Sequence, residues 1–239
     1  MTMTSKTILV TGANRGIGRA LAAEALARGA ARVYAGTRQP LAHPDDRVTP
    51  LCLDVTSTAQ IEAAASQVGS LDMLINNAGI ALPDDLSDPA MLERHLAVNL
   101  FGTYAVTQAF LPAVTRARGA IVNILSVNAL APLPFVIPAY SVSKAAAFSL
   151  TQSLRARVAG QGVSVHAVLP GPVDTDMLRG SGIPKASPES VARAVFDAVE
   201  DGEEEIFPDP ASAPLAAGWG ASAAKLLERQ LAQAAPVPW

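Results

Sequence analysis

The chain contains few of the residues that build disulfides, metal sites and nucleic-acid surfaces. Its single cysteine, Cys52, excludes an internal disulfide, and we expect a reducing, cytoplasmic location. The 18 lysine and arginine residues are scattered and the formal net charge is −3, so no basic stripe predicts a nucleic-acid partner. The three histidines, His43, His95 and His166, lie far apart without the spacing of metal ligands, so we expect no metal.

Long uninterrupted hydrophobic runs are also missing. The N-terminus leads almost directly into a short apolar stretch, without the charged start and apolar segment of a signal peptide. The apolar stretch 121–139 is interrupted by polar residues and prolines, namely Asn123, Ser126, Asn128, Pro132, Pro134 and Pro138. This stretch therefore fits a buried strand followed by an apolar loop, and we expect no membrane partner.

Apolar, strand-like stretches alternate with helical stretches along the 239 residues. Strands are expected at residues 7–11, 32–37, 49–54, 71–76, 119–126, 163–169 and, as a short strand, 205–207. Helices are expected at residues 19–28, 56–68, 89–115, 139–159 and 188–199. Continuous apolar strands separated by helices predict an α/β fold, with one doubly wound parallel sheet of about seven strands and helices on both faces.

We expect a single domain over residues 1–239, because α/β sheets of this size usually form one unit. Its core covers residues 7–207. The tail, residues 208–239, is rich in alanine and proline and is expected to lie peripherally, with a helix at 217–232.

A glycine-rich turn, Thr11-Gly-Ala-Asn-Arg-Gly-Ile-Gly18, follows the first expected strand and precedes a helical stretch. Gly12 can adopt a backbone angle denied to other residues, Gly16 allows close approach to a pyrophosphate, and Gly18 allows tight helix–sheet packing. The amides at the helix start and the positive end of the helix dipole would face the phosphates. A lone glycine turn can merely cap a helix, but the order strand, glycine turn, helix predicts a dinucleotide-binding Rossmann fold.

Tyr140 and Lys144 lie four residues apart in an expected helix, so the phenol and the ammonium share one face. The ammonium can favour the phenolate and turn the tyrosine into an acid/base. On most surface helices such a pair is only solvated. Here it follows the glycine turn and an isolated Ser126, and this order favours the functional interpretation.

Candidate residues follow several strands at the edge where ligands bind in such a sheet, beyond the carboxyl ends of the strands. In chain order they are the turn from Gly12 to Gly18, Arg38, Asp54, the run from Asn76 to Gly79, Ser126, and the pair Pro170-Gly171. We therefore expect six loops to converge on one cleft.

Together these motifs resemble the short-chain dehydrogenase/reductase family over residues 7–199. The resemblance implies hydride exchange between a nicotinamide and a carbonyl or alcohol, with Asn99, Ser126, Tyr140 and Lys144 as catalytic residues. Tyr140 would protonate the developing oxyanion and Ser126 would donate a second hydrogen bond. Lys144, helped by the charge of the oxidised nicotinamide, would lower the pKa of the phenol, and it would also hold the nicotinamide ribose. Asn99 would lie in a bent helix and join a water relay to Lys144. Without the resemblance, Asn99 is better explained as a helix asparagine bonded to its own backbone.

The cofactor is expected to be NADP. The second strand ends in Gly36-Thr37-Arg38 instead of an acidic residue, and Arg38 and Arg15 can bind the extra phosphate from two sides, although each can also be a solvated loop charge. Asp54-Val55 resembles the pair that contacts the adenine. The resemblance places the whole cofactor against Gly12, Asn14, Arg15, Gly16, Ile17, Gly18, Arg38, Asp54, Val55, Asn77, Ala78, Gly79, Tyr140, Lys144, Pro170, Gly171, Val173 and Thr175.

One departure from the family pattern concerns Ser126, which lies 14 positions before Tyr140, one more than usual. Either the loop between them carries an extra residue or Ser126 is displaced, and Asn128 could then help or replace it. Ser141 and Ser143 are expected to project away from the face of Tyr140.

The substrate is expected to be an apolar carbonyl compound or alcohol. The segment 130–137 is apolar, and the loop 173–187 carries Met177, Leu178 and Ile183, although these residues could simply pack the loops. Arg179 and Lys185 in this loop could contact a charged group. The resemblance implies a homodimer, and the missing Val-Asp-Gly-Gly ending of tetrameric members puts a tetramer in doubt.

The expected activity is therefore that of an NADP(H)-dependent oxidoreductase. The alternative is an NADP-binding regulatory or scaffold protein of the same fold without turnover, which would not need the Tyr, Lys, Ser and Asn set. A nucleotide-sugar epimerase or dehydratase normally carries a larger carboxyl-terminal substrate domain, for which this sequence has no room.

Overall fold

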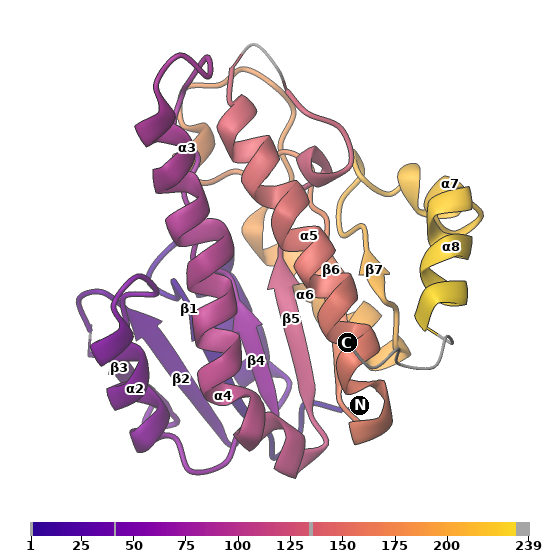
Figure 1. Cartoon of the computed structure of the whole chain (residues 1–239). Helices are drawn as coiled ribbons and strands as arrows, with labels where there is room; N and C mark the ends of the chain where they lie inside the picture. Colours follow the sequence, from indigo (N-terminus) through magenta and orange to yellow (C-terminus); the bar gives the residue numbers. More distant parts are fainter. Residues whose placement is uncertain (1, 41, 134–135, 233–239) are drawn as a thin grey trace.

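The computed structural model describes residues 2–40, 42–133 and 136–232. Within these ranges, seven parallel strands form one sheet in the order β3-β2-β1-β4-β5-β6-β7, flanked by helices (Figure 1). The strands are β1 (Thr7–Thr11), β2 (Arg32–Thr37), β3 (Val48–Cys52), β4 (Met73–Asn76), β5 (Ala120–Ile124), β6 (Ser164–Val168) and β7 (Glu205–Ile206). The predicted doubly wound parallel sheet is confirmed.

The helices cover both faces of the sheet. They are α1 (Gly16–Ala27), α2 (Thr58–Gln67), α3 (Pro89–Leu96), α4 (Thr103–Ala117), α5 (Pro138–Val158), α6 (Pro188–Asp201), α7 (Leu215–Gly220) and α8 (Ala223–Ala232). Successive β1 residues point to opposite faces: Ile8 and Val10 join the core that α1 and α6 cover, and Leu9 joins the core under α2, α4 and α5. This two-sided burial explains why the strands are apolar throughout.

The expected helix 89–115 is interrupted in the structure. Residues Ala97–Gly102 form a π-helical turn between α3 and α4. Such turns are rare inside helices and often occur at functional sites. Asn99 lies in this turn, at the position where the resemblance implied a bent helix.

The tail packs more closely than expected. The side chain of Lys225 on α8 is buried, and its ammonium contacts Glu204, Glu205 and Glu228. Trp219 on α7 makes an edge-to-face contact with Phe148 on α5. The expected helix 217–232 is interrupted by Ala221 and Ser222, and α7 and α8 lie beside β7 (Figure 1).

Candidate active site

The glycine turn lies at the carboxyl end of β1 and adopts the strained geometry that its sequence predicts. Gly12 and Gly16 have positive φ angles of 67° and 53°. A Cβ on Gly18 would overlap the backbone oxygen of Gly12 and the side-chain amide of Asn77. Because α1 begins at Gly16, its first backbone amides face this edge of the sheet.

Asn77 braces this turn from the end of β4. Its side-chain amide donates to the backbone oxygens of Thr11 (2.9 Å) and Gly12 (3.2 Å). In return, the Thr11 hydroxyl accepts hydrogen bonds from the backbone amides of Asn77 (2.9 Å) and Ala78 (3.0 Å). Asn77 and Ala78 therefore hold the glycine turn against the end of β4.

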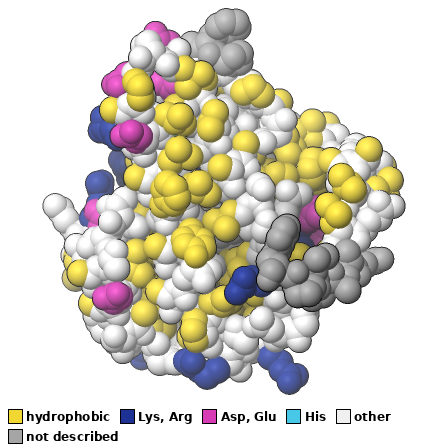
Figure 2. All heavy atoms as spheres, in the orientation of Figure 1, with side chains coloured by type: hydrophobic (Ala, Val, Ile, Leu, Met, Phe, Trp, Pro, Cys, Tyr) yellow, Lys and Arg dark blue, Asp and Glu magenta, His cyan; other side chains and the backbone are white. Residues whose placement is uncertain are grey.

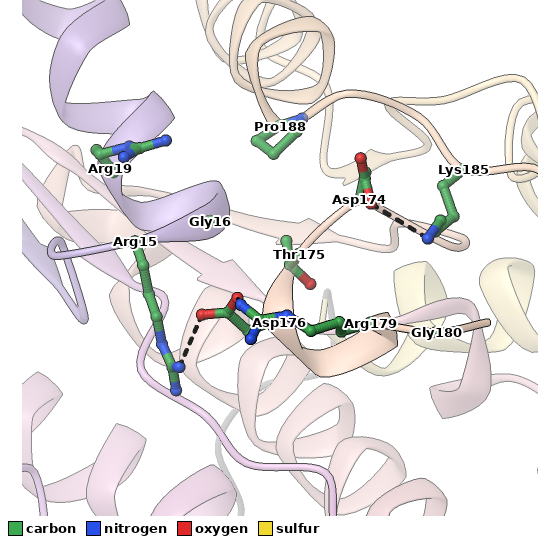
Figure 3. Close-up of a pocket in the computed structure, with 10 residues that line it drawn as sticks. All are labelled: Arg15, Gly16, Arg19, Asp174, Thr175, Asp176, Arg179, Gly180, Lys185 and Pro188. Atoms are coloured by element: carbon green, nitrogen blue, oxygen red, sulfur yellow. Dashed lines mark hydrogen bonds and ion pairs between the residues drawn. The ribbon is translucent and has the colours of Figure 1, made fainter.

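A cavity of about 390 Å³ lies between the glycine turn and the loop that follows β6 (Figure 3). Thr175 closes one side, since a Cβ on Gly16 would lie 3.0 Å from its methyl group. Arg15 points across the cavity, and its Nη1 lies 2.9 Å from Asp176 Oδ2. Arg179 also pairs with Asp176, and the Arg15 hydrogen bond followed by the Arg179 charge lowers the pKa of Asp176.

The two arginines that were expected to flank one phosphate lie in different surroundings. Arg38 follows β2, and its charge helps to lower the pKa of Asp54, although hydrogen bonds from the amide and hydroxyl of Thr56 have the larger effect. Arg15 is paired with Asp176 instead. Cys52 is close to this end of the site, with its Sγ 3.8 Å from the backbone oxygen of Arg38.

Tyr140 and Lys144 lie in the first two turns of α5, and both side chains are buried. The Lys144 ammonium lies 5.7 Å from the centre of the Tyr140 ring and donates to the backbone oxygen of Ile124 at 2.8 Å. Burial lowers the pKa of Lys144 to about 8. The lysine is thus anchored to the end of β5, beside the phenol.

In the protein by itself, burial raises the pKa of Tyr140 to about 12, against a smaller lowering by a hydrogen bond with Ser126. The acidification of the phenol by Lys144 together with the charge of an oxidised nicotinamide stays a prediction. A phenol with this pKa is protonated at neutral pH and is ready to donate a proton.

Ser126 reaches Tyr140 despite the unusual spacing of 14 positions. It follows β5 and begins a short 3₁₀ turn, Val127–Ala129, in which the serine oxygen accepts from the amide of Asn128 at 3.1 Å. The extra residue therefore lies in the loop and does not displace Ser126 from the phenol. Part of that loop, Pro134 and Phe135 of the expected apolar segment 130–137, lies outside the described residues.

Asn99 links three parts of the site. Its Oδ1 accepts from the amide of Ile80, and its Nδ2 donates to the backbone oxygen of Ile80 and to Ser143 Oγ, each at 2.9 Å. Ser143 in turn donates to the backbone oxygen of Tyr140 at 2.7 Å. The interpretation of Asn99 as a residue bonded to its own backbone is therefore wrong. A Cβ on Gly79 would lie 3.2 Å from Asn99 Oδ1 and 3.6 Å from Lys144 Nζ, so these two groups meet at Gly79.

The loop after β6 is held by Asp209, which the sequence analysis did not identify. Its carboxylate is buried and accepts from the amide of Gly171 at 2.8 Å and from the amide and hydroxyl of Ser212. Pro170 is fixed from the other side, since its backbone oxygen accepts from the amide of Val127. The only local signal for Asp209 is its position between two prolines directly after the last strand. The tail thus helps to position a loop of the expected cofactor site.

The described part of the chain carries no group of three or more His, Cys, Asp or Glu side chains arranged to bind a metal. Among the same residues, every helix is too short or too polar to cross a bilayer. Residues 6–184 match the family described as short chain dehydrogenase. The chain belongs to this family.

The chain is also similar to individual members of the short-chain dehydrogenase family. A crystal structure of a short chain dehydrogenase from Burkholderia cenocepacia in complex with NADP superposes with a TM-score of 0.86 at 38% identity, over 96% of this chain and 99% of that one. The 2-(S)-hydroxypropyl-CoM dehydrogenase 3 of Xanthobacter autotrophicus is 36% identical over 79% of this chain and 80% of its own length. The short chain dehydrogenase tazN of Aspergillus terreus is 35% identical over 87% of this chain, but the match spans only 49% of tazN.

Proposed function

We propose that the chain is an NADP(H)-dependent oxidoreductase that interconverts a carbonyl compound and an alcohol, with Tyr140 as the general acid/base. The observation that carries this proposal is the meeting of Ser126, Tyr140 and Lys144 at the carboxyl edge of the sheet, on the same edge as the glycine turn. The described residues fit a dinucleotide, because the turn leaves no room for side chains at Gly12 and Gly18 and borders a cavity of about 390 Å³.

Each part of the site would hold one part of the cofactor. The backbone amides at the start of α1 and the side chain of Thr175 would bind the pyrophosphate. Arg38 would bind the additional phosphate of NADP, and Asp54 with Val55 would contact the adenine. Lys144 would hold the nicotinamide ribose. The NADP bound to the related Burkholderia protein supports this choice of cofactor.

The chemistry of the protein residues follows from their protonation states. A bound nicotinamide would supply or accept the hydride. When a carbonyl is reduced, negative charge develops on its oxygen, and Tyr140 and Ser126 can both donate hydrogen bonds to that atom. Because the pKa of Tyr140 is about 12, the phenol holds its proton at neutral pH and can transfer it to the oxygen. Oxidation of an alcohol would require the phenolate and would therefore be favoured at alkaline pH.

The substrate in this proposal is an apolar carbonyl compound or alcohol. Met177 and Ile183, in the loop after β6, are both about half exposed, which leaves their side chains available to a ligand. The names of relatives such as 2-(S)-hydroxypropyl-CoM dehydrogenase 3 are consistent with a small secondary alcohol or ketone. The expected cytoplasmic location stays a prediction.

The experiment that tests this function follows NADPH absorbance with a panel of aldehydes, ketones, diketones, quinones and steroids. Tyr140→Phe should lower kcat by about 10²- to 10⁴-fold with little change in NADPH affinity, because only proton transfer is lost. Equal turnover by Tyr140→Phe would refute the role of the phenol. Tight NADPH binding without turnover on any compound would instead favour a regulatory or scaffold protein.

We also propose a homodimer that pairs α4 and α5 with the same helices of a second copy. Hydrophobic side chains gather over these helices in the middle of the face in Figure 2. On these helices and on the π-helical turn before α4, the side chains of Phe101, Tyr104 and Val142 are 61%, 48% and 46% exposed, and exposed apolar patches mark contact surfaces. A hollow of about 240 Å³ between Tyr104 and Leu150 could accept a side chain of the partner.

A further inference from the structure

The segment Ile80–Asp84 follows Gly79 in the loop after β4. Every second residue of this segment forms hydrogen bonds with another part of the structure. Ile80 is held by Asn99 through two hydrogen bonds of 2.9 Å. The amide of Leu82 donates to His95 Nε2 at 3.0 Å. Asp84 contacts the start of α5 through its backbone and its side chain. The segment therefore connects the helix that carries Asn99 to the helix that carries Tyr140.

His95 is fully buried one helical turn before Asn99, so the two side chains contact the segment in succession. Because the amide of Leu82 donates to Nε2, that nitrogen must be the acceptor, and Nδ1 carries the proton and donates to the backbone oxygen of Met91 at 2.7 Å. Both ring nitrogens are thus bound to backbone groups.

The ring of His95 packs against the phenol ring. The His95 and Tyr140 ring centroids lie 6.4 Å apart with the planes at 71°, an edge-to-face contact. His95 therefore ties the backbone of Leu82 on one side and supports the ring of Tyr140 on the other. Its contribution is to hold the phenol in one orientation.

Asp84 supplies the cap that α5 lacks in its own sequence. The helix starts at Pro138, which has no amide proton, and the preceding Ile137 provides no side-chain cap. Asp84 accepts from the amide of Ala139 with both carboxylate oxygens, at 3.1 and 3.3 Å, and its own amide donates to Val136 at 3.2 Å. A carboxylate at this position satisfies an otherwise free amide and complements the positive end of the helix.

We propose that His95 and Asp84 are positioning residues for Tyr140, one through its ring and the other through the first turn of α5. This proposal rests on the proposed role of Tyr140 as acid/base. Neither residue touches the reacting atoms in the proposed mechanism. Tyr140 directly follows Ala139, so a shift of the first turn would move the phenol relative to Ser126, and such shifts of about 1 Å can cost 100-fold in rate.

Two variants of Asp84 separate its charge from its role as a hydrogen-bond acceptor for the amide of Ala139. Asp84→Asn keeps an acceptor for the amide of Ala139 but removes the charge, whereas Asp84→Ala removes both.

The test therefore compares Asp84→Asn with Asp84→Ala, and His95→Gln with His95→Phe. We expect Asp84→Ala and His95→Gln to lower kcat by about 10- to 100-fold with the KM for NADPH nearly unchanged. Asp84→Asn, which keeps the acceptor for the amide of Ala139, and His95→Phe, which keeps a ring against Tyr140, should recover most of kcat. Asp88→Ala is the matched control, because Asp88 caps α3 through the amide of Ala90 as Asp84 caps α5 through the amide of Ala139.

A second readout works even without a known substrate. The chain has three tyrosines, so Tyr34→Phe with Tyr104→Phe leaves Tyr140 as the only phenol whose titration is followed by ultraviolet absorbance. In that background we expect the phenol pKa to fall in Asp84→Ala, because a displaced first turn would reduce the burial that raises this pKa, and to stay unchanged in Asp88→Ala. Losses of kcat in Asp84→Ala and His95→Gln no larger than in Asp88→Ala would overturn the positioning roles. An unchanged phenol pKa in Asp84→Ala would overturn the role of Asp84.

The failure of the proposed function has a different signature. If Tyr140→Phe keeps full turnover, Tyr140 is not the acid/base, and the phenol titration alone then decides whether Asp84 acts on this side chain. If turnover depends on Tyr140 but the Asp84 and His95 variants behave like the control, the proposed function stands and the positioning roles fail.

Discussion

The Lys144 ammonium donates a hydrogen bond to the backbone oxygen of Ile124 at 2.8 Å while it lies 5.7 Å from the centre of the Tyr140 ring. Burial lowers the pKa of Lys144 to about 8 and raises that of Tyr140 to about 12. In the protein by itself, both groups are therefore driven toward their neutral forms. As the pH rises, the Lys144 shift increases the free energy of unfolding and the Tyr140 shift decreases it.

We expect the free energy of unfolding to rise above about pH 8 through Lys144. The unfolded chain keeps this proton up to a pKa of 10.5, whereas the folded protein loses it at about 8, so the unfolded state binds more protons in this window. Tyr140 has the opposite effect above about pH 10, because the unfolded phenol ionises at 10.0 and the folded phenol only at about 12. Urea unfolding at a series of pH values measures both slopes. In Lys144→Met the free energy of unfolding should no longer rise above about pH 8, and in Tyr140→Phe it should no longer fall above about pH 10. A rise of wild-type size in Lys144→Met would contradict the assignment.

Gly18→Ala should destabilise the protein by about 1–3 kcal/mol and weaken NADPH binding. The added Cβ would overlap the backbone oxygen of Gly12 and the amide of Asn77, and neither group can retreat without moving the glycine turn. Gly160→Ala is the control, because no heavy atom lies within 4 Å of the Cβ that it would add. Thermal unfolding and fluorescence titration with NADPH provide the two measurements. If Gly18→Ala and Gly160→Ala unfold at the same temperature and bind NADPH with the same affinity, tight packing at Gly18 is not required.

Arg38→Asp should shift the preference between NADP and NAD toward NAD by about 10- to 100-fold in kcat/KM, because a charge-assisted contact to the phosphate is lost and a carboxylate repels it. Arg15→Ala should have a smaller effect, since Arg15 is already paired with Asp176. Arg32→Asp, at the opposite end of the same strand, controls for the change of charge. Steady-state kinetics with both cofactors decide the question, and unchanged NADP selectivity in Arg38→Asp would exclude this residue as the phosphate ligand.

Tyr104→Glu should convert the proposed homodimer into a monomer. The substitution places a charge in the apolar face of α4 and α5, where it would be desolvated on association. Leu227→Glu, at a side chain of similar exposure on α8, should leave the mass unchanged. Size-exclusion chromatography with light scattering measures the mass, and a wild-type protein that is monomeric at all concentrations would refute the dimer.

Lys225→Met should destabilise the fold by about 3–5 kcal/mol. The ammonium is buried among Glu204, Glu205 and Glu228, and within the described ranges its loss would leave Arg155 as the single counter-charge of the buried Glu205 side chain. A second substitution, Glu205→Gln, should restore part of the lost stability, because it removes the uncompensated charge. Urea unfolding of the single and double variants tests this coupling. Additive losses in the double variant would show that the two residues do not interact.

Much of the architecture could be predicted because its signals are local. The strands are continuous apolar runs, and the glycine turn needs residues without side chains at fixed positions, as the overlap at Gly18 shows. Tyr140 and Lys144 share a helix face because helical geometry alone brings residues four apart together. The position of the site at the carboxyl edge of the sheet follows from the parallel order of the strands.

The sequence by itself thus determined the sheet, the glycine turn and the residues that meet at its edge, because each depends on neighbours in the chain. Only the tertiary structure decided that Asp84 caps a helix more than 50 positions away, that His95 packs on Tyr140, and that Asp209 holds the loop after β6. It also decided the direction of the Tyr140 pKa. Desolvation depends on every atom packed around a group, and that environment is assembled from residues that no local pattern brings together.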